Sequence, residues 1–544
     1  MNSIQFNSIQ FNSIAITLNF IFLLIPAIFL IYYVYSLGIY FLICYFQISQ
    51  ILKFQKLENC IFIFKNAFYK KINFMEEIMS QKTTKRVFTR KSKLFLVLAS
   101  MILALSCKNP LGDESGGSGG GGGSGGQTIT NKDGRVFPAW YLTEQQQQQN
   151  FSIGPTILFD TRRNDGKPNQ LGDQQYRIPA IIAATNGNII VFADNRYNHG
   201  NDIGVQNAKK IDIVYKVSKD GGNSWSQEKT IPPLSPSASL RNADNKGDVA
   251  VFKHPDGTLV AMAVSGGGYA SGGNANTPSR MVRSESKDNG DTWSQWKEVG
   301  EALFNTIKTK HGKAQAFMTS GRGLTLKDGT FVNAMGGPDW SIIYVYSKDK
   351  GMTWNYGQYI KGSESSGGKY TLWVGEPKVI AQLDDGKLLM SIRNATQLSV
   401  TRNTPRKFII STTSADNDPN VSWPTQLSSW NFIDGDADAE GVLWTSKKDG
   451  ADITRILHIQ AGPQRRKGLA LYLSIDEGKT FTKKYDILAN NIGACYSSID
   501  VLGDGTVITA AEEQSDNGQY YDIAFRRYNM KTLTGEVYKT EWYK

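Results

Sequence analysis

Several charged side chains interrupt apolar, strand-like runs of the chain, and their types indicate binding of an anion. Arg177 lies inside YRIP between apolar neighbours, Arg393 ends the run MSIRN, and Arg465 and Arg466 stand just before LALYLS. A planar guanidinium forms two parallel hydrogen bonds to a carboxylate, so three converging arginines would anchor a carboxylate-bearing substrate. Taken singly, an arginine at a strand end is more often a surface or ion-paired residue.

Carboxyl and phenol groups stand in similar positions. The segment 194–204, DNRYNHGNDIG, is a polar loop after an expected strand and carries Asp194 and Asp202. Glu376 opens a strand in GEPK, and Tyr496 lies in the strand-like run GACYSSID. None of these residues belongs to the motifs that recur along the chain, so structural repetition does not explain them.

One such motif predicts a repeat architecture. The pattern S-x-D-x-G-x-[ST]-aromatic begins at Ser218, Ser286, Ser347 and Ser474, at intervals of 68, 61 and 127 residues. The last interval equals two periods, and the segment 411–423, STTSADNDPNVSW, fits a decayed copy between them. Five copies predict an array of similar supersecondary units. We expect the Ser and Asp to bind backbone N–H groups of a turn, the Gly to take a positive φ, and the aromatic ring to pack between units.

A second marker gives the architecture. Six Asn-Gly or Asp-Gly turns each lead into a β-prone run, at Gly187, Gly257, Gly329, Gly386, Gly450 and Gly505. Such dipeptides are hairpin signals. Four-stranded units repeated around an axis form a β-propeller, which protects strand edges by radial repetition. The pattern therefore predicts an all-β, six-bladed β-propeller over residues 151–544, in which the blade closed by both chain ends lacks the repeated motif.

The region before the propeller has the features of an export signal and a tether. Residues 75–107 contain a basic stretch, an apolar run and a final Ser-Cys, the plan of a lipoprotein signal peptide with Cys107 as the lipidated residue. An uncleaved signal anchor is the alternative, although the apolar run is shorter than the ~20 residues of a membrane span. Residues 108–127 form a Gly/Ser-rich linker.

Residues 1–74 are apolar and of low complexity, and we interpret them as a doubtful upstream extension, because a signal peptide should begin a chain. A transmembrane span is the other interpretation. These features predict an exported lipoprotein, attached through its lipid to the bacterial outer membrane or cell surface. A periplasmic or secreted location is the alternative.

Composition excludes several functions. Of the net charge of +11, the segment Met1–Cys107 contributes +8, from 11 Lys or Arg against 3 Asp or Glu, so nucleic-acid binding has little support. Only Cys495 lies beyond Cys107, which rules out an internal disulfide framework in the main body. The chain has four His and no Cys/His cluster at zinc-ligand spacing, so neither a metal nor a cofactor is predicted. The oligomeric state stays open.

In combination, the motifs resemble a known family. YRIP, the four repeated boxes and GP-x-x-R ahead of a box are similar to the bacterial sialidases, the exo-α-sialidases of the six-bladed propeller fold. The resemblance covers about residues 151–544 and implies hydrolysis of terminal sialic acids from glycoproteins, glycolipids or oligosaccharides. Sialylated glycoconjugates would then be the partners of the chain.

The resemblance also implies roles for single residues. Arg177, Arg393 and Arg466 match the arginine triad that binds the substrate carboxylate, with Arg465 as the alternative for the third. Tyr496 matches the nucleophile and Glu376 the base that activates it, which a phenol with a pKa of about 10 requires. Asp202 matches the acid/base residue, with Asp194 as its competitor; Arg196 and Asp248 resemble residues that contact the sugar around its 4-hydroxyl.

Three other functions stay open. A glycan-binding propeller without catalysis would have lost Tyr496, Glu376 or Asp202, and all three are present. A propeller glycosidase for neutral glycans would leave the three arginines without a partner. A variant that transfers sialic acid or releases an anhydro product has the same motifs.

Overall fold

The computed structural model describes residues 129–130, 136–161, 174–197, 200–205, 210–233, 245–270, 272, 278–366, 369–394, 406–425, 435–462, 466–515 and 521–543. All of them belong to one compact unit, Gly122–Lys544. The extension 1–74, the signal peptide 75–107 with Cys107, the linker 108–127 and Arg465 lie outside the described residues.

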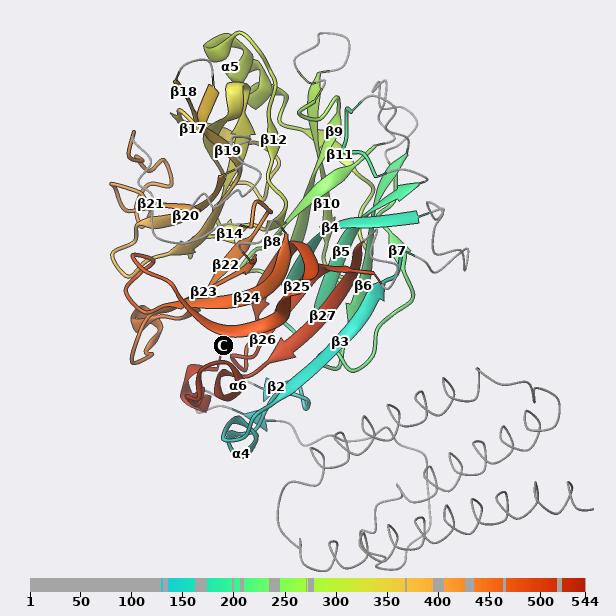
Figure 1. The fold of residues 1–544 in the computed structure, drawn as a ribbon, viewed down its shortest axis with the longest axis vertical. Coiled ribbons are helices and arrows are strands. Elements are labelled where there is room, and N and C mark those ends of the chain that lie inside the picture. Colours follow the sequence, from blue (N-terminus) through green and yellow to red (C-terminus); the bar gives the residue numbers. More distant parts are fainter. Residues whose placement is uncertain are drawn as a thin grey trace, which may run out of the picture. The chain divides into compact units, whose positions relative to one another are not determined.

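Figure 1 shows β-sheets set around a common centre, the arrangement of a β-propeller. The first sheet has the order β4 (Gln174–Ala183), β5 (Ile189–Tyr197), β6 (Ile211–Ser218), β7 (Lys229–Thr230). The second contains β8 (Gly247–Lys253), β9 (Leu259–Gly266), β10 (Ser279–Ser286) and β11 (Lys297–Val299), with β13 (Gly321–Arg322) parallel to β8. The expected all-β propeller is thus confirmed.

The next two sheets follow in chain order. The third contains β12 (Phe317–Met318), β14 (Leu324–Thr325), β15 (Phe331–Gly337), β16 (Ser341–Ser347) and β17 (Asn355–Ile360). The fourth contains β18 (Ser363–Ser366), β19 (Lys369–Gln382), β20 (Leu388–Asn394) and β21 (Lys407–Ile410). The helices of the described residues are short: α4 (Glu144–Gln147), α5 (Glu301–His311) and α6 (Met530–Thr534), with 3-10 turns η1 (Pro338–Trp340), η2 (Lys447–Asp449) and η3 (Thr540–Trp542).

The last large sheet joins two groups of strands. Its order is β22 (Glu440–Thr445), β23 (Arg455–Ala461), β24 (Lys467–Ser474), β25 (Thr482–Val501), β26 (Val507–Gln514), β27 (Tyr521–Tyr528), β3 (Ser152–Phe159). The first half of β25 pairs with β24 and the second half with β26, so one 20-residue strand serves both groups. The early strand β3 pairs with β27, so the two ends of the unit are joined. A small separate sheet pairs β1 (Ile129–Thr130) with β2 (Val136–Phe137).

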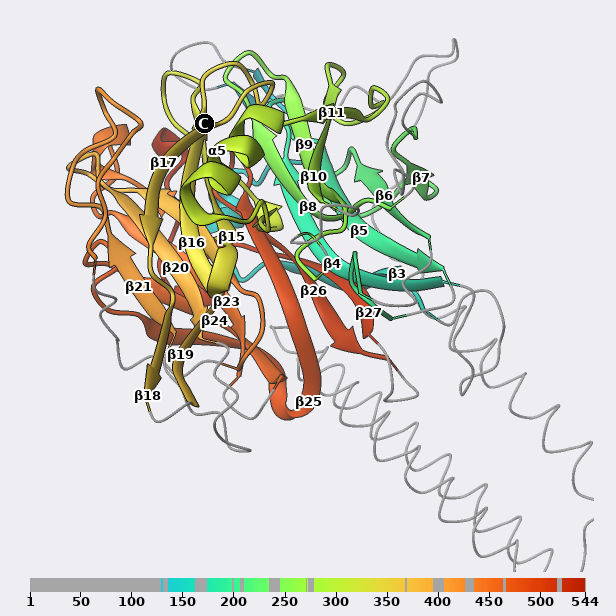
Figure 2. The ribbon, with the colours of Figure 1, turned by 90° about the horizontal axis from the view of Figure 1, so that it is seen from above.

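Two long hairpins extend one side of the molecule. Figure 2 shows the β18–β19 hairpin and the first half of β25 reaching beyond the neighbouring strands on the same side. Residues 369–375 of β19 precede Glu376, and residues 482–495 of β25 precede Tyr496. The two strands that carry the expected base and nucleophile therefore both continue past them toward this side.

The six predicted turns are present, each with its glycine at a φ between 75° and 91°. They lie at Gly187, Gly257, Gly329, Gly386, Gly450 and Gly505, and are followed by β5, β9, β15, β20, β23 and β26 respectively. A positive φ is open to glycine at no steric cost, which explains why the sequence repeats this residue.

The four repeated boxes form the same turn. In the first, the Ser218 hydroxyl accepts a bond from the Gly222 N–H (2.8 Å), and the Asp220 carboxylate accepts one from the Ser224 N–H (2.9 Å). The Trp225 ring lies 4.9 Å from Phe525 of the sheet that closes the molecule. The same side-chain bonds recur in the boxes that begin at Ser286, Ser347 and Ser474. The predicted structural role of the boxes is confirmed.

The decayed copy keeps its aromatic residue but not the turn. Trp423 is buried, with its ring 5.5 Å from that of Tyr344 on β16. The Asp416 carboxylate accepts bonds from Gln382 and Lys448. This segment therefore retains the packing contact between sheets, while its acid binds neighbouring side chains.

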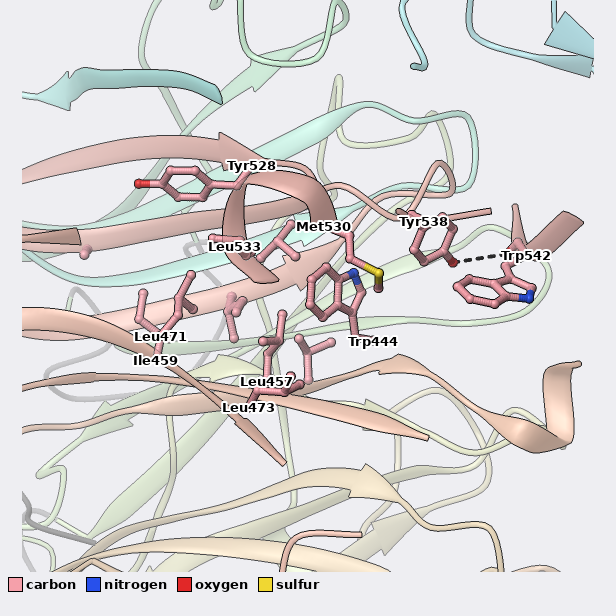
Figure 3. Packing of buried hydrophobic residues seen from close by; sticks show 14 of the residues in the cluster. Trp444, Leu457, Ile459, Leu471, Leu473, Tyr528, Met530, Leu533, Tyr538 and Trp542 are labelled. Atoms are coloured by element: carbon pink, nitrogen blue, oxygen red, sulfur yellow. Dashed lines mark hydrogen bonds between the residues drawn. The ribbon is translucent and has the colours of Figure 1, made fainter. Parts of the chain in front are cut away.

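Buried side chains fill the space between sheets. Figure 3 shows one cluster in which Trp444 of β22 packs with Leu457, Leu473 and Met530, close to Tyr538 and Trp542 of the last segment of the chain. The Trp444 indole N–H donates to the Gly505 carbonyl at 2.8 Å, which satisfies its buried polar atom. None of the helices in the described ranges has the length and hydropathy of a membrane span.

Candidate active site

The structure brings Tyr496 and Glu376 together from different sheets. Tyr496 lies on β25 and Glu376 on β19, and the Tyr496 hydroxyl donates a short hydrogen bond to Glu376 Oε1. The Tyr496 backbone N–H donates to Glu512 Oε2 at 3.2 Å, which fixes the strand position of the phenol. The two residues are 120 positions apart in sequence, so only the assembled propeller creates the pair.

Three guanidinium groups surround the Tyr496 ring. Arg177 of β4 lies 5.5 Å from the ring centroid, Arg393 of β20 lies 5.9 Å from it, and Arg466, next to the start of β24, lies 5.8 Å from it. The Arg393 Nη1 also donates to the Tyr496 hydroxyl at 3.1 Å and to Glu376 Oε2 at 2.6 Å. The predicted set of arginines, base and phenol therefore forms one cluster.

Two acids that the sequence reading missed hold the arginines. Glu512, fully buried, accepts from Arg177 Nε at 2.7 Å and from the Ile178 N–H at 2.7 Å. Asp436 binds two arginines at once: its Oδ1 accepts from Arg393 Nη2 at 3.2 Å, and its backbone carbonyl accepts from Arg466 Nε at 3.0 Å. These contacts fix the directions of the three forks before any substrate arrives.

A pattern in the sequence could have revealed Asp436. It belongs to the series Asp434, Asp436, Asp438, Glu440, in which every second residue is acidic. Side chains two apart in an extended chain point to one face, so the series predicts a row of carboxylates entering β22. Glu512 has no such signal, because its partners lie on two other strands.

Backbone strain is concentrated around the same cluster. Ten residues other than glycine have a positive φ in the described part of the chain, and five of them are at or beside the site: Ile178, Asp248, Glu376, Asp436 and Arg466. Glu376 also lies at a bulge, where the register between β19 and β20 shifts. Such conformations are costly and persist where the surrounding structure enforces them, which is typical of functional sites.

The electrostatics of the pair set its resting protonation state, a neutral phenol beside an ionised carboxylate. Burial raises the pKa of Tyr496 well above its ordinary value, and the nearby Glu376 charge raises it further. Burial opposes ionisation of Glu376, but the Arg393 charge and the hydrogen bonds from Tyr496 and Arg393 outweigh it, so its pKa is lowered. In this state the phenol is neutral and the carboxyl ionised, the starting point for a nucleophile with its base.

Asp202 and Asp194 differ sharply in accessibility. Arg196 Nη1 pairs with Asp202 at 2.7 Å, and Arg196 Nη2 pairs with Asp194 at 3.0 Å. The Asp202 side chain is 67% exposed, whereas those of Asp194 and Arg196 are 1% exposed. Burial raises the pKa of Asp202, but the Arg196 and Arg177 charges outweigh it and lower that pKa; burial raises the pKa of Asp194 to about 6. Only Asp202 can reach a substrate without rearrangement.

Arg196 therefore lies behind Asp202, where its contacts are with the two carboxylates and the Gly200 carbonyl. Asp248 opens β8 nearby, and its N–H donates to Asp194 Oδ1 at 3.0 Å. Burial and the Asp194 charge raise the pKa of Asp248 well above its ordinary value. In the described residues no group of three or more His, Cys, Asp or Glu could hold a metal ion.

A cavity of about 470 Å³ in the described residues lies away from this chemistry. It is lined by the opposite ends of the inner strands and their turns, including Ile182, His254, Arg322, Leu383 and Trp444. The candidate site is an open cluster that approaches solvent through Arg177, Arg393 and Glu376, whose side chains are 19%, 13% and 15% exposed.

Fold and site together define a β-propeller with an arginine-lined site around a tyrosine and a carboxylate. The chain belongs to the BNR repeat-like domain family, whose pattern matches residues 204–508, more than half of its length.

Comparison with known proteins finds sequence relatives and a structural neighbour. A sialidase of Bacteroides fragilis is 24% identical over 357 residues, which cover 60% of this chain and 58% of that protein. An exo-alpha-sialidase of Aspergillus fumigatus is 24% identical over 433 residues, 73% of this chain and 95% of that protein. The NanB sialidase of Streptococcus pneumoniae superposes with a TM-score of 0.51 at 15% identity, covering 70% of this chain and 71% of that one. The chain spans a little over half the length of the bacterial sialidases it matches.

Proposed function

We propose that the protein is an exo-α-sialidase that removes terminal sialic acids from glycoconjugates with retention of anomeric configuration. The observation that carries the proposal is the Tyr496–Glu376 hydrogen bond inside a ring of three guanidinium groups. Sialic acid carries a carboxylate on its anomeric carbon, and converging arginine forks suit that group. The similarity to proteins named sialidase supports the same substrate class.

Each residue has a role in the proposed reaction. Arg177, Arg393 and Arg466 hold the substrate carboxylate. The Tyr496 oxygen attacks the anomeric carbon while its proton passes to Glu376, and Asp202 in its protonated form gives a proton to the departing glycosidic oxygen. Because the Arg196 and Arg177 charges lower the pKa of Asp202 in the free protein, Asp202 must take up this proton in the substrate complex, where the substrate carboxylate offsets part of that positive charge. Asp202 then takes a proton from the water that displaces Tyr496, Glu376 returns the proton to the phenol oxygen, and the two inversions give net retention.

A phenol suits this substrate better than a carboxylate nucleophile. An ionised Asp or Glu approaching the anomeric carbon would meet the substrate carboxylate with like-charge repulsion, whereas neutral Tyr496 does not. Sialidases with a tyrosine nucleophile are a known exception to the two-carboxylate scheme of glycosidases, so the proposed attack by Tyr496 follows a known type of reaction.

The proposed fold is a propeller of six blades. The seven-stranded sheet would supply two of them, with β25 shared and β3 completing the second. The six hairpin turns support one blade each.

Release of sialic acid from a fluorogenic aryl sialoside by the purified protein tests the proposal. We expect turnover of the sialoside and none of the matching aryl galactoside. Binding of sialosides without turnover would favour the glycan-binding alternative, and NMR of the product would separate hydrolysis from transfer or anhydro release.

Arg466→Lys keeps the positive charge but loses the planar fork, so we expect the KM for sialosides to rise by roughly tenfold to a hundredfold, as for loss of a charge-assisted hydrogen-bond pair. Steady-state kinetics measures the change, with Arg465→Lys as the neighbouring control. A larger effect of Arg465→Lys would move the third triad position by one residue.

We further propose that the mature protein is anchored by lipid on Cys107 to the outer membrane or cell surface, with residues 108–127 as a tether; the signal-like segment 75–107 supports this. Cys107→Ser should abolish labelling by a palmitate analogue and release the protein or stall its processing. Metabolic labelling with fractionation measures both. Unchanged labelling of the variant would exclude Cys107 as the lipidated residue.

A further inference from the structure

A buried ion pair lies directly behind Glu376 and has no part in the proposed mechanism. Lys378 follows Glu376 by two residues on β19, and its Nζ lies 2.7 Å from Asp438 Oδ2. The two side chains are 2% and 3% exposed, so solvent does not screen them. Burying two charges is expensive even when they are paired, so such a pair calls for an explanation beyond stability.

A second acid lies beside the pair. A Cβ placed on Gly321 would lie 2.6 Å from Lys378 Nζ and 3.0 Å from both carboxylate oxygens of Glu440. The ammonium group therefore packs against the Gly321 backbone with Glu440 next to it. Glu440 also accepts bonds from the Arg322 N–H, the Ser498 hydroxyl and the Ile499 N–H. One lysine thus faces two buried carboxyl groups.

Acidic and basic residues pair in order along the inner strands. Asp436 pairs with Arg393 at the site, Asp438 pairs with Lys378 one step deeper, and Glu440 binds the backbone of Arg322 beyond it. Arg393 is 13% exposed and reaches the site, whereas Lys378 is 2% exposed. Of these cations, Lys378 is the buried one that lies two residues from Glu376 on the same strand.

We propose that Lys378 is a positioning residue that keeps Glu376 a carboxylate while Arg393 is engaged with the substrate. The proposal rests on the proposed function. Without substrate, Arg393 Nη1 lies 2.6 Å from Glu376 Oε2 and supplies the balancing charge. When the guanidinium shares its charge with a substrate carboxylate, the site gains an anion close to Glu376. The fixed ammonium behind Glu376 then opposes its protonation.

The charged groups around Glu376 and Lys378 determine in which direction loss of Lys378 shifts protonation of the cluster. The groups that face the Glu376–Lys378 region from neighbouring elements are Asp248, Arg322, Arg393, Asp436, Asp438, Glu440, His458 and Tyr496. Burial raises the pKa of Asp438 to about 7, with Glu376 adding to the rise and Lys378 opposing it. The cluster therefore lies close to taking up a proton at neutral pH, and loss of Lys378 favours that uptake.

Two substitutions should shift the pH dependence of kcat in opposite directions. Lys378→Met removes the cation, so the pKa of Glu376 in the substrate complex rises and the acid limb of kcat moves up by about one pH unit. Asp438→Asn removes the anion and leaves the cation, so the acid limb moves down. KM should change by less than about threefold in both variants, because neither side chain reaches the substrate. Lys387→Met, which removes an exposed lysine from the turn before β20, is the matched control and should leave the profile unchanged.

If Lys378 had a structural role alone, both variants would lower kcat without moving the acid limb of kcat in opposite directions. The proposal is overturned if the acid limb moves in the same direction in both variants or moves in neither. If Lys378→Met does not fold, Asp438→Asn decides alone, since its acid limb must move down. The carboxyl ¹³C shift of Glu376, assigned with Glu376→Gln, gives a readout independent of turnover. In the presence of bound sialic acid its titration midpoint should rise in Lys378→Met, and an unchanged midpoint under those conditions contradicts the proposal. Absence of sialoside turnover in the unsubstituted protein would instead reject the proposed function.

Discussion

Replacing Tyr496 with Phe is expected to leave the protein folded and to lower kcat on sialosides by a thousandfold or more. The substitution deletes one oxygen and keeps the ring, whose centroid lies within 5.9 Å of all three guanidinium groups. The lost oxygen is the atom that the proposed mechanism bonds to the anomeric carbon, and loss of a nucleophile removes the covalent route altogether. A loss of about a thousandfold corresponds to ~4 kcal/mol in the activation free energy. Steady-state kinetics with thermal unfolding measures both parts of the expectation.

Tyr521→Phe is the matched control for this prediction. The Tyr521 ring also lies 5.5 Å from the Arg177 guanidinium, but Tyr521 has no part in the proposed reaction. Its substitution should change kcat by less than about tenfold. Glu376→Gln should be nearly as damaging as Tyr496→Phe, and the double variant little worse than either, because residues that act as a unit are not additive. Substantial turnover by a folded Tyr496→Phe protein would remove Tyr496 from the mechanism.

The parts of the fold that depend on neighbouring residues could be predicted from the sequence. The turn glycines and the boxes are local features, since Ser218 and Asp220 bind N–H groups within the same turn. Pairing between sheets is not local. The residues of β25 do not reveal that this one strand pairs with two groups of strands. Lys467 of β24 and Glu513 of β26 both pair with β25, and these pairings depend on how the whole propeller closes.

In the candidate site, too, some residues could be predicted from the sequence and others could not. That Arg177, Glu376 and Tyr496 form one cluster could be predicted through the family resemblance, because each interrupts an apolar run and belongs to no repeated motif. Their supports could not be predicted: Glu512 is bound to Arg177 across 335 positions of the sequence. For Arg196 the resemblance implied contact with the sugar, while the structure has its guanidinium bound to Asp194 and Asp202. This pairing holds Asp202 in place.

The second large effect concerns Asp202, and it depends on the leaving group. An acid catalyst is needed in proportion to the basicity of the departing oxygen, because its proton stabilises that oxygen only when it leaves as a strong base. Natural glycans leave as alkoxides, and aryl sialosides leave as stabilised phenolates. Asp202→Ala should therefore lower kcat/KM on a sialyl-lactose-type substrate by about 10²- to 10⁴-fold, the usual range for a positioned acid. On an activated aryl sialoside the loss should be tenfold or less.

The control for Asp202 is Asp194, the other carboxyl bound to Arg196. Asp194→Asn removes a buried charge that accepts hydrogen bonds from Arg196 and from the Asp248 N–H. It should therefore lower the free energy of unfolding and reduce kcat/KM by a similar factor for every leaving group. If Asp202 only held the substrate, natural and aryl sialosides would lose activity by a similar factor, as uniform binding losses do. A series of phenols of decreasing pKa separates the two cases, because the loss in Asp202→Ala must shrink as the phenol becomes more acidic. A constant loss across the series, together with a graded one in Asp194→Asn, would transfer the acid role to Asp194 in spite of its burial.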